Sequence, residues 1–166
     1  MKKNSGLTLI ELMVVAVILG IIMLAVNEFL GNGLQFFSSN QAKLEIQRDA
    51  RRIINLLNRN LRQSRASSIV ISSYDTNQPP WSYISFETID NKSYHFYQKD
   101  TKMYMCDLTR GATQQIAENL RHLTFCYPML PNDEIISISL CFEKYSLSRN
   151  VKSLQLSVEK VRIMNE

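Results

Sequence analysis

Hydrophobic residues are concentrated near the N-terminus, where residues 12–26 are all apolar or glycine. Extended back to Leu7, the block is 20 residues long, and only Thr8 and Glu11 interrupt it. As a helix it would rise about 30 Å, which is the thickness of the hydrocarbon core of a bilayer. We therefore expect a single membrane span over residues 7–27.

A second pattern follows this block, because hydrophobic side chains recur every three or four positions between residues 41 and 64. This spacing is typical of an amphipathic helix with one apolar face. Together the two patterns predict one long helix from Leu7 to about Ala66, of which residues 28–66 form the amphipathic half. The apolar face consists of Ile46, Ala50, Ile53, Ile54, Leu57 and Leu61.

The other side of this helix is basic, with Arg48, Arg51, Arg52, Arg59, Arg62 and Arg65. Glu45 and Asp49 each stand three positions before an arginine, a spacing at which side chains on a helix meet. We therefore expect part of this charge to be balanced within the helix. The remaining arginines are interpreted as a solvated face, of which some pair with acidic residues of neighbouring chains. DNA binding is the alternative, although no aromatic residue for base stacking stands among the arginines.

Beyond residue 67 the hydrophobic period changes to two, which is typical of half-buried strands. Strands after one long helix predict an α+β fold in which the helix packs on an antiparallel β-sheet domain over residues 67–166. The predicted strands are 68–74, 82–89, 93–98, 102–108, 120–127, 135–145 and 153–163, and residues 114–119 are ambiguous.

The last two predicted strands have the most informative alternation. In residues 135–145 the side chains expected to face inward are those of Ile136, Ile138, Leu140 and Phe142. In residues 153–163 the inward side chains are predicted to be Leu154, Leu156 and Val158, followed by Val161 and Ile163. The change of phase between Val158 and Val161 predicts a β-bulge.

The charge distribution predicts an orientation in the membrane. The formal net charge is only +4, which by itself does not indicate nucleic-acid binding. Lys2 and Lys3 precede the apolar block, so the positive-inside rule keeps the N-terminus in the cytoplasm and the residues after Val26 exported.

The residues around Gly6 differ from an ordinary secretory signal, in which the small residue follows the apolar run. The sequence KKNSG-LTLIEL closely resembles the class III signal of type IV pilins and type II secretion pseudopilins. In that family the prepilin peptidase cuts after the glycine and methylates the new N-terminal amine. The resemblance implies a leader over residues 1–6, cleavage between Gly6 and Leu7, and N-methylation of Leu7. The family usually has phenylalanine as its first residue, and Leu7 is a departure.

Glu11 is the charged residue of the expected span, where a carboxylate costs about 2 kcal/mol or more without a partner. Thr8 and Glu11 fit the capping box S/T-x-x-E, which would place the carboxylate at the start of the helix. The resemblance implies a second role, in which Glu11 pairs with the free N-terminal amine of a neighbouring subunit. The two interpretations are compatible, because a capping carboxylate can exchange partners on assembly.

Within the family, the chain is most similar to J-type minor pseudopilins and W-type minor pilins, through QRDARRIINLLNRNLRQS, LRHLTFCY and LQLSVEKVRI. The resemblance implies a structural subunit that initiates or caps a type II secretion pseudopilus or a type IV pilus. Its partners would be other minor subunits, the major subunit, the prepilin peptidase and the inner-membrane assembly platform. The alternatives are a tip receptor for DNA or a surface, and an unprocessed single-span periplasmic protein.

No enzyme motif such as GxSxG, HExxH or a P-loop occurs in the sequence. His95 and His122 stand apart, and a hairpin turn explains Asp90 and Asn91 without a calcium ion. We therefore expect no catalytic residues, no cofactor and no metal.

Three cysteines, Cys106, Cys126 and Cys141, allow at most one disulfide within the chain. Cys126 and Cys141 fall on the polar faces of neighbouring predicted strands and form the candidate pair. If Cys126 and Cys141 were directly opposite each other, two prolines of the connecting loop would lie within a strand, where prolines are disfavoured. A loop centred near Pro131 instead places Cys126 opposite about Ser137, so the pairing stays open.

Overall fold

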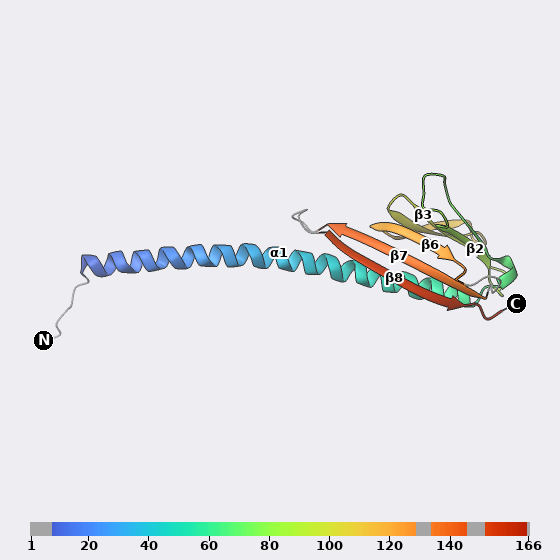
Figure 1. Cartoon of the computed structure of the whole chain (residues 1–166), viewed down its shortest axis with the longest axis horizontal. Helices are drawn as coiled ribbons and strands as arrows, with labels where there is room; N and C mark the ends of the chain where they lie inside the picture. The colour runs from blue at the N-terminus through green and yellow to red at the C-terminus, as the bar shows by residue number, and fades with distance from the viewer. Residues whose placement is uncertain (1–7, 129–133, 146–151, 166) are drawn as a thin grey trace. The chain divides into compact units, whose positions relative to one another are not determined.

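The computed structural model describes residues 8–128, 134–145 and 152–165 (Figure 1). The chain divides into two compact units, residues 1–38 and residues 39–166. The long helix α1 (Leu9–Arg62) begins in the first unit and ends in the second. The remaining elements all belong to the second unit: η1 (Ala66–Ser68), β1 (Val70–Ser72), β2 (Tyr83–Glu87), β3 (Ser93–Lys99), β4 (Lys102–Asp107), β5 (Ala112–Ala117), β6 (Leu120–Cys126), β7 (Ile135–Tyr145) and β8 (Lys152–Arg162).

The strands of the described residues form two antiparallel sheets. Strands β1 to β5 pair in sequence order in a five-stranded sheet, and β6, β7 and β8 pair in a three-stranded sheet. Backbone hydrogen bonds of 2.9 Å join the two sheets, from Phe125 N to Trp81 O and from Leu120 N to Thr101 O. The predicted α+β class, with one long helix packed on antiparallel strands, is confirmed. The ambiguous residues 114–119 fall largely within β5.

The core lies between the C-terminal part of α1 and the inner faces of both sheets. The predicted apolar face of the helix supplies five side chains that are no more than 1% exposed: Ile46, Ala50, Ile53, Leu57 and Leu61. The predicted inward side chains of β7, from Ile136 to Phe142, are buried against them. Each fully buried leucine, isoleucine or phenylalanine stabilises the fold by about 1.5–3 kcal/mol relative to exposure, so this shared core holds the helix to the strands.

The outer face of β7 is tied to both of its neighbours by Glu143. Its carboxylate lies 3.1 Å from the guanidinium of Arg121 on β6 and 2.7 Å from the amine of Lys152 on β8. The hydrogen bond from Lys152, together with the charge of Arg121, lowers the pKa of Glu143. This outward orientation agrees with the predicted alternation of the strand.

Strand β8 corrects one part of the sequence prediction. It pairs with β7 in unbroken register from Ile135↔Arg162 to Tyr145↔Lys152, so the predicted bulge is absent. As a result Leu154, Leu156 and Val158 face outward, with 51%, 65% and 56% of their surface exposed. The polar residues between them take the inner side, and only Val161 and Ile163 are buried as predicted. The register with β7 sets the phase, and because β8 is the edge of its sheet, half-buried polar side chains keep access to water there.

A pair of substitutions tests this orientation. Leu156→Ser should change the free energy of unfolding by no more than about 0.5 kcal/mol, because the side chain is already in water. Val161→Ser should cost about 2 kcal/mol or more, because it removes buried apolar surface and buries a hydroxyl. Urea unfolding of the two variants in detergent measures the difference. Equal losses would mean that the inward phase predicted for Leu156 was right.

Candidate functional site

The first turn of α1 is closed by the predicted capping box. The Glu11 Oε2 atom accepts hydrogen bonds from the backbone N and the hydroxyl of Thr8, both at 2.9 Å. In return the Thr8 hydroxyl accepts a longer bond of 3.4 Å from the backbone N of Glu11. These bonds occupy backbone donors that have no partner inside the helix, and the carboxylate lies at the positive end of the helix dipole. All of these groups are exposed, so a cation from another molecule can reach the carboxylate.

The N-terminal part of α1 carries an exposed, largely apolar surface, which we call the apolar stem and define as residues 9–37; Asn27, Glu28, Asn32 and Gln35 are polar positions in its second half. Every residue in this range is exposed. Phe29, Leu34, Phe36 and Phe37 extend the surface well beyond the apolar block. By length and composition α1 is capable of crossing a membrane. The apolar stem rises about 42 Å, whereas the hydrocarbon core of a bilayer is about 30 Å thick. A bilayer can therefore cover only part of it.

The predicted processing residues, Gly6 and Leu7, lie outside the described residues, and the cleavage and methylation sites stay predictions. The leader over residues 1–6 lies there as well.

The basic side of α1 has fewer internal partners than its sequence suggests. Among the described residues, Arg48, Arg51 and Arg52 make no ion pair, and neither do Arg59 and Arg62. Glu45 does not pair within the helix as expected but with Lys144 of β7, at 2.5 Å. At 3.6 residues per turn, the five arginines project within an arc of roughly 100° on the side opposite the core.

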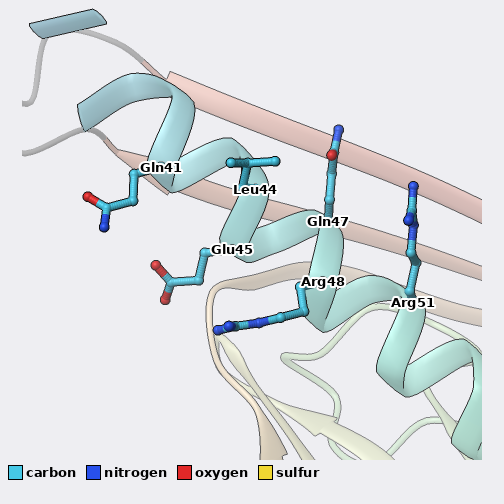
Figure 2. Close-up of a pocket in the computed structure, with 6 residues that line it drawn as sticks. All are labelled: Gln41, Leu44, Glu45, Gln47, Arg48 and Arg51. Carbon is cyan, nitrogen blue, oxygen red and sulfur yellow. The ribbon is translucent and has the colours of Figure 1, made fainter. Parts of the chain in front are cut away.

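Figure 2 shows the N-terminal end of this basic side, where a shallow hollow in the surface of α1 is lined entirely by helix residues. Arg48 and Arg51 point away from the helix in different directions, and Leu44 lies between polar neighbours. Among the described residues, no other element forms a wall of this hollow, so its arginines are open to solvent or to a partner protein.

The structure does not bring the candidate disulfide pair together. Cys126 lies opposite Ser137, as the loop argument predicted, whereas Cys141 lies opposite His122. The four-residue offset along β7 corresponds to about 13 Å, well beyond the Cα separation that a disulfide spans. All three cysteines are free thiols in the structure.

Tyrosine rings cluster on the outer face of the five-stranded sheet, in the region between Trp81 and Tyr104 where the sequence is rich in tyrosine and phenylalanine but does not distinguish core or cross-strand packing from an exposed interface. The ring of Tyr97 stacks between those of Tyr74 and Tyr104, with centroid separations of 4.3 and 5.5 Å. Beside them the Tyr83 hydroxyl lies 2.8 Å from His95 Nδ1. Burial raises the pKa values of Tyr83 and Tyr97. Strand register places three of these rings together, because Tyr83, Tyr97 and Tyr104 are directly opposite one another on β2, β3 and β4.

His95 makes the stability of the second unit depend on pH. Partial burial lowers the pKa of His95 below its ordinary value of 6.5, because the charged imidazolium loses hydration. As pH falls through 6.5 the unfolded chain takes up a proton before the folded chain does, so stability decreases with decreasing pH in this window. We expect His95→Gln to flatten the stability profile between pH 7.5 and the folded pKa. Urea midpoints at several pH values measure this, and an unchanged slope would contradict it.

Comparison with known proteins gives a family match for the N-terminal part of the chain. Residues 1–27 match the family model of the prokaryotic N-terminal methylation motif. No curated protein and no solved structure gives a match. The matched residues contain the signal KKNSG-LTLIEL and the start of the apolar stem. The chain therefore carries a prokaryotic N-terminal methylation motif ahead of a helix long and apolar enough to cross a membrane, in an α+β architecture that is pilin-like.

Proposed function

We propose that this protein is a minor subunit that initiates or caps assembly of a type II secretion pseudopilus or a type IV pilus. Cleavage after Gly6 and N-methylation of Leu7 prepare it for that role. The observation that carries the proposal is the length of the apolar stem, whose rise of about 42 Å exceeds the thickness of the bilayer core. Large exposed apolar patches mark sites that other proteins cover. A bundle of neighbouring subunit helices provides that cover.

Glu11 gives the bundle its selectivity. Within the apolar stem its carboxylate is stabilised only by Thr8 among the described residues. The N-terminal amine of a neighbouring subunit, freed by cleavage, supplies a full opposite charge in place of the backbone and hydroxyl donors. An ion pair in a low-dielectric environment is worth far more than one in water. A subunit that lacks either charge is therefore rejected from the bundle.

The proposal implies a sequence of locations and partners. The chain begins as a single-pass protein of the inner membrane, with its N-terminus in the cytoplasm and residues 67–166 periplasmic or extracellular. The prepilin peptidase processes it, and the inner-membrane assembly platform moves it into a filament with other minor subunits and the major subunit. The domain limits at residues 6, 27 and 66 are part of this proposal. The minor role rests on the resemblance of three segments, residues 47–64, 120–127 and 154–163, to minor subunits.

The N-terminal residue of the membrane-bound chain tests the proposal directly. Mass spectrometry of the mature protein should give N-methyl-leucine, corresponding to Leu7, as the first residue, and the protein should co-purify with sheared filaments. A mature chain that starts at Met1 would contradict the proposal and favour an unprocessed single-span protein. A chain that is processed but absent from filaments would contradict the structural role alone.

A tip receptor for DNA is a second candidate, favoured by the five arginines of α1 that have no acidic partner among the described residues. This function predicts salt-sensitive DNA binding by the full chain in detergent, because each phosphate contact releases counterions. Binding should then be lost when Arg51, Arg59 and Arg62 are replaced. Binding that is absent, or unaffected by these substitutions, would contradict it.

A further inference from the structure

A second hollow on the basic side of α1 has walls from three elements. It is a groove of about 380 Å³ between α1 and strands β4 and β5. Three half-buried apolar side chains that pack against the core line it: Leu56 of the helix, Met105 of β4 and Ile116 of β5. Strand β5 is the edge of the five-stranded sheet, so the groove lies beside a strand that has one neighbour only among the described strands.

The rim of the groove is basic. Arg52 and Arg59 both line it, together with Asn55 of the helix and Gln114 of β5, and none of its described lining residues is acidic. The two arginines are two helical turns apart, which is about 10.5 Å along the axis. Neither makes an ion pair with any described residue. An apolar floor flanked by two unpaired cations fits a partner with apolar anchors and flanking carboxylates.

We propose that this groove receives an acidic amphipathic helix of a neighbouring subunit, an inference that rests on the proposed filament function. Arg52–Leu56 and Asn55–Arg59 are rows at i, i+4 spacing, the ridges against which a second helix packs. Apolar residues at i, i+3 and i+7 of the partner would contact Leu56, Met105 and Ile116. Its carboxylates would accept bidentate hydrogen bonds from the two guanidinium groups, for which arginine is better suited than lysine.

The composition of the floor favours a helix over a nucleic acid. Leucine, methionine and isoleucine side chains give bases no aromatic surface on which to stack. A phosphate backbone would contact arginines along the whole basic side, from Arg48 to Arg62, without preference for this groove. An acidic helix seated in the groove depends on Arg52 and Arg59 and not on Arg48 and Arg51, which line the separate hollow of Figure 2.

The test places a photo-crosslinking amino acid at the exposed position of Asn55 in the full chain, expressed in cells that assemble the filament. Crosslinking should join this position to an acidic amphipathic helix of another filament subunit, identified by mass spectrometry of the linked peptides. Charge reversal by Arg52→Glu with Arg59→Glu should reduce the yield by about tenfold or more. The matched reversal, Arg48→Glu with Arg51→Glu, removes the same charge from the same helix and should leave the yield within about twofold. Arginines introduced for the acids of the captured helix should restore crosslinking to the Arg52→Glu, Arg59→Glu chain.

Each alternative outcome contradicts the inference. Crosslinks to nucleic acid, or equal losses for the two charge reversals, would assign the arginines to polyanion binding. A captured segment that is not an acidic helix would exclude the proposed occupant. Filament incorporation, measured in the same cells, separates the two proposals. A chain that enters filaments without a crosslink at position 55 overturns the inference alone, whereas a chain that never enters filaments overturns both.

Discussion

Glu11→Gln should leave the protein in the membrane and reduce its incorporation into filaments by about a hundredfold or more. Glutamine has nearly the shape of glutamate and can still close a capping box, so the start of α1 is preserved. The substitution removes only the charge. Leaving the amine of a neighbouring subunit without its counter-charge in a low-dielectric bundle costs about 3–5 kcal/mol, which is the origin of the expected loss.

A matched variant distinguishes the role of the Glu11 charge in assembly from its role in capping the helix. Thr8→Val removes the hydroxyl that bonds to Glu11 but keeps the carboxylate. It should weaken the helix start by about 1 kcal/mol and leave filament incorporation largely intact. Alkaline extraction of membranes measures insertion, and the filament fraction measures incorporation. If Glu11→Gln entered filaments as well as the unaltered chain does, Glu11 would be a structural cap and the proposed selectivity would be wrong.

Leu57→Ala should cost the second unit about 2–5 kcal/mol of unfolding free energy. Leu57 has no exposed surface and belongs to the core that joins α1 to both sheets. Its truncation leaves a cavity in that core, because neighbouring side chains relax only partly. A loss of this size is a large part of the stability of an ordinary domain, so we also expect a lower level of the protein in cells.

Leu44→Ala is the control, because Leu44 lies on the same helix but is 66% exposed. It should change stability by no more than about 0.5 kcal/mol. Urea unfolding of the full chain in detergent, followed by the fluorescence of Trp81, reports on the second unit, because Trp81 is the one tryptophan of the chain. Similar losses for the two variants would show that the helix is held by something other than the face that contains Leu57.

Local patterns in the sequence were sufficient to predict most elements of the fold, although they left β5 ambiguous. The helix period from Ile46 to Leu61 correctly identified the face that α1 buries, because helical side chains three and four positions apart always share a side. The run around Val14 and Ile22 and the signal before it required no knowledge of distant residues. The capping box of Thr8 and Glu11 is local in the same sense, and the structure contains it.

The tertiary structure decided which partners these elements meet. Leu154, Leu156 and Val158 point outward because β8 takes its phase from the register with β7, and the hydrophobicity of a strand alone does not set that register. Glu45 pairs with Lys144 because the folded chain brings the end of β7 to the helix. The groove at Arg52 and Arg59 exists for the same reason, since one wall comes from α1 and the other from strands many residues later. Local patterns therefore specified the apolar block before Asn27, the cap and the buried helix face, whereas contacts between distant segments determined the orientation of β8 and the groove that we propose receives a neighbouring subunit.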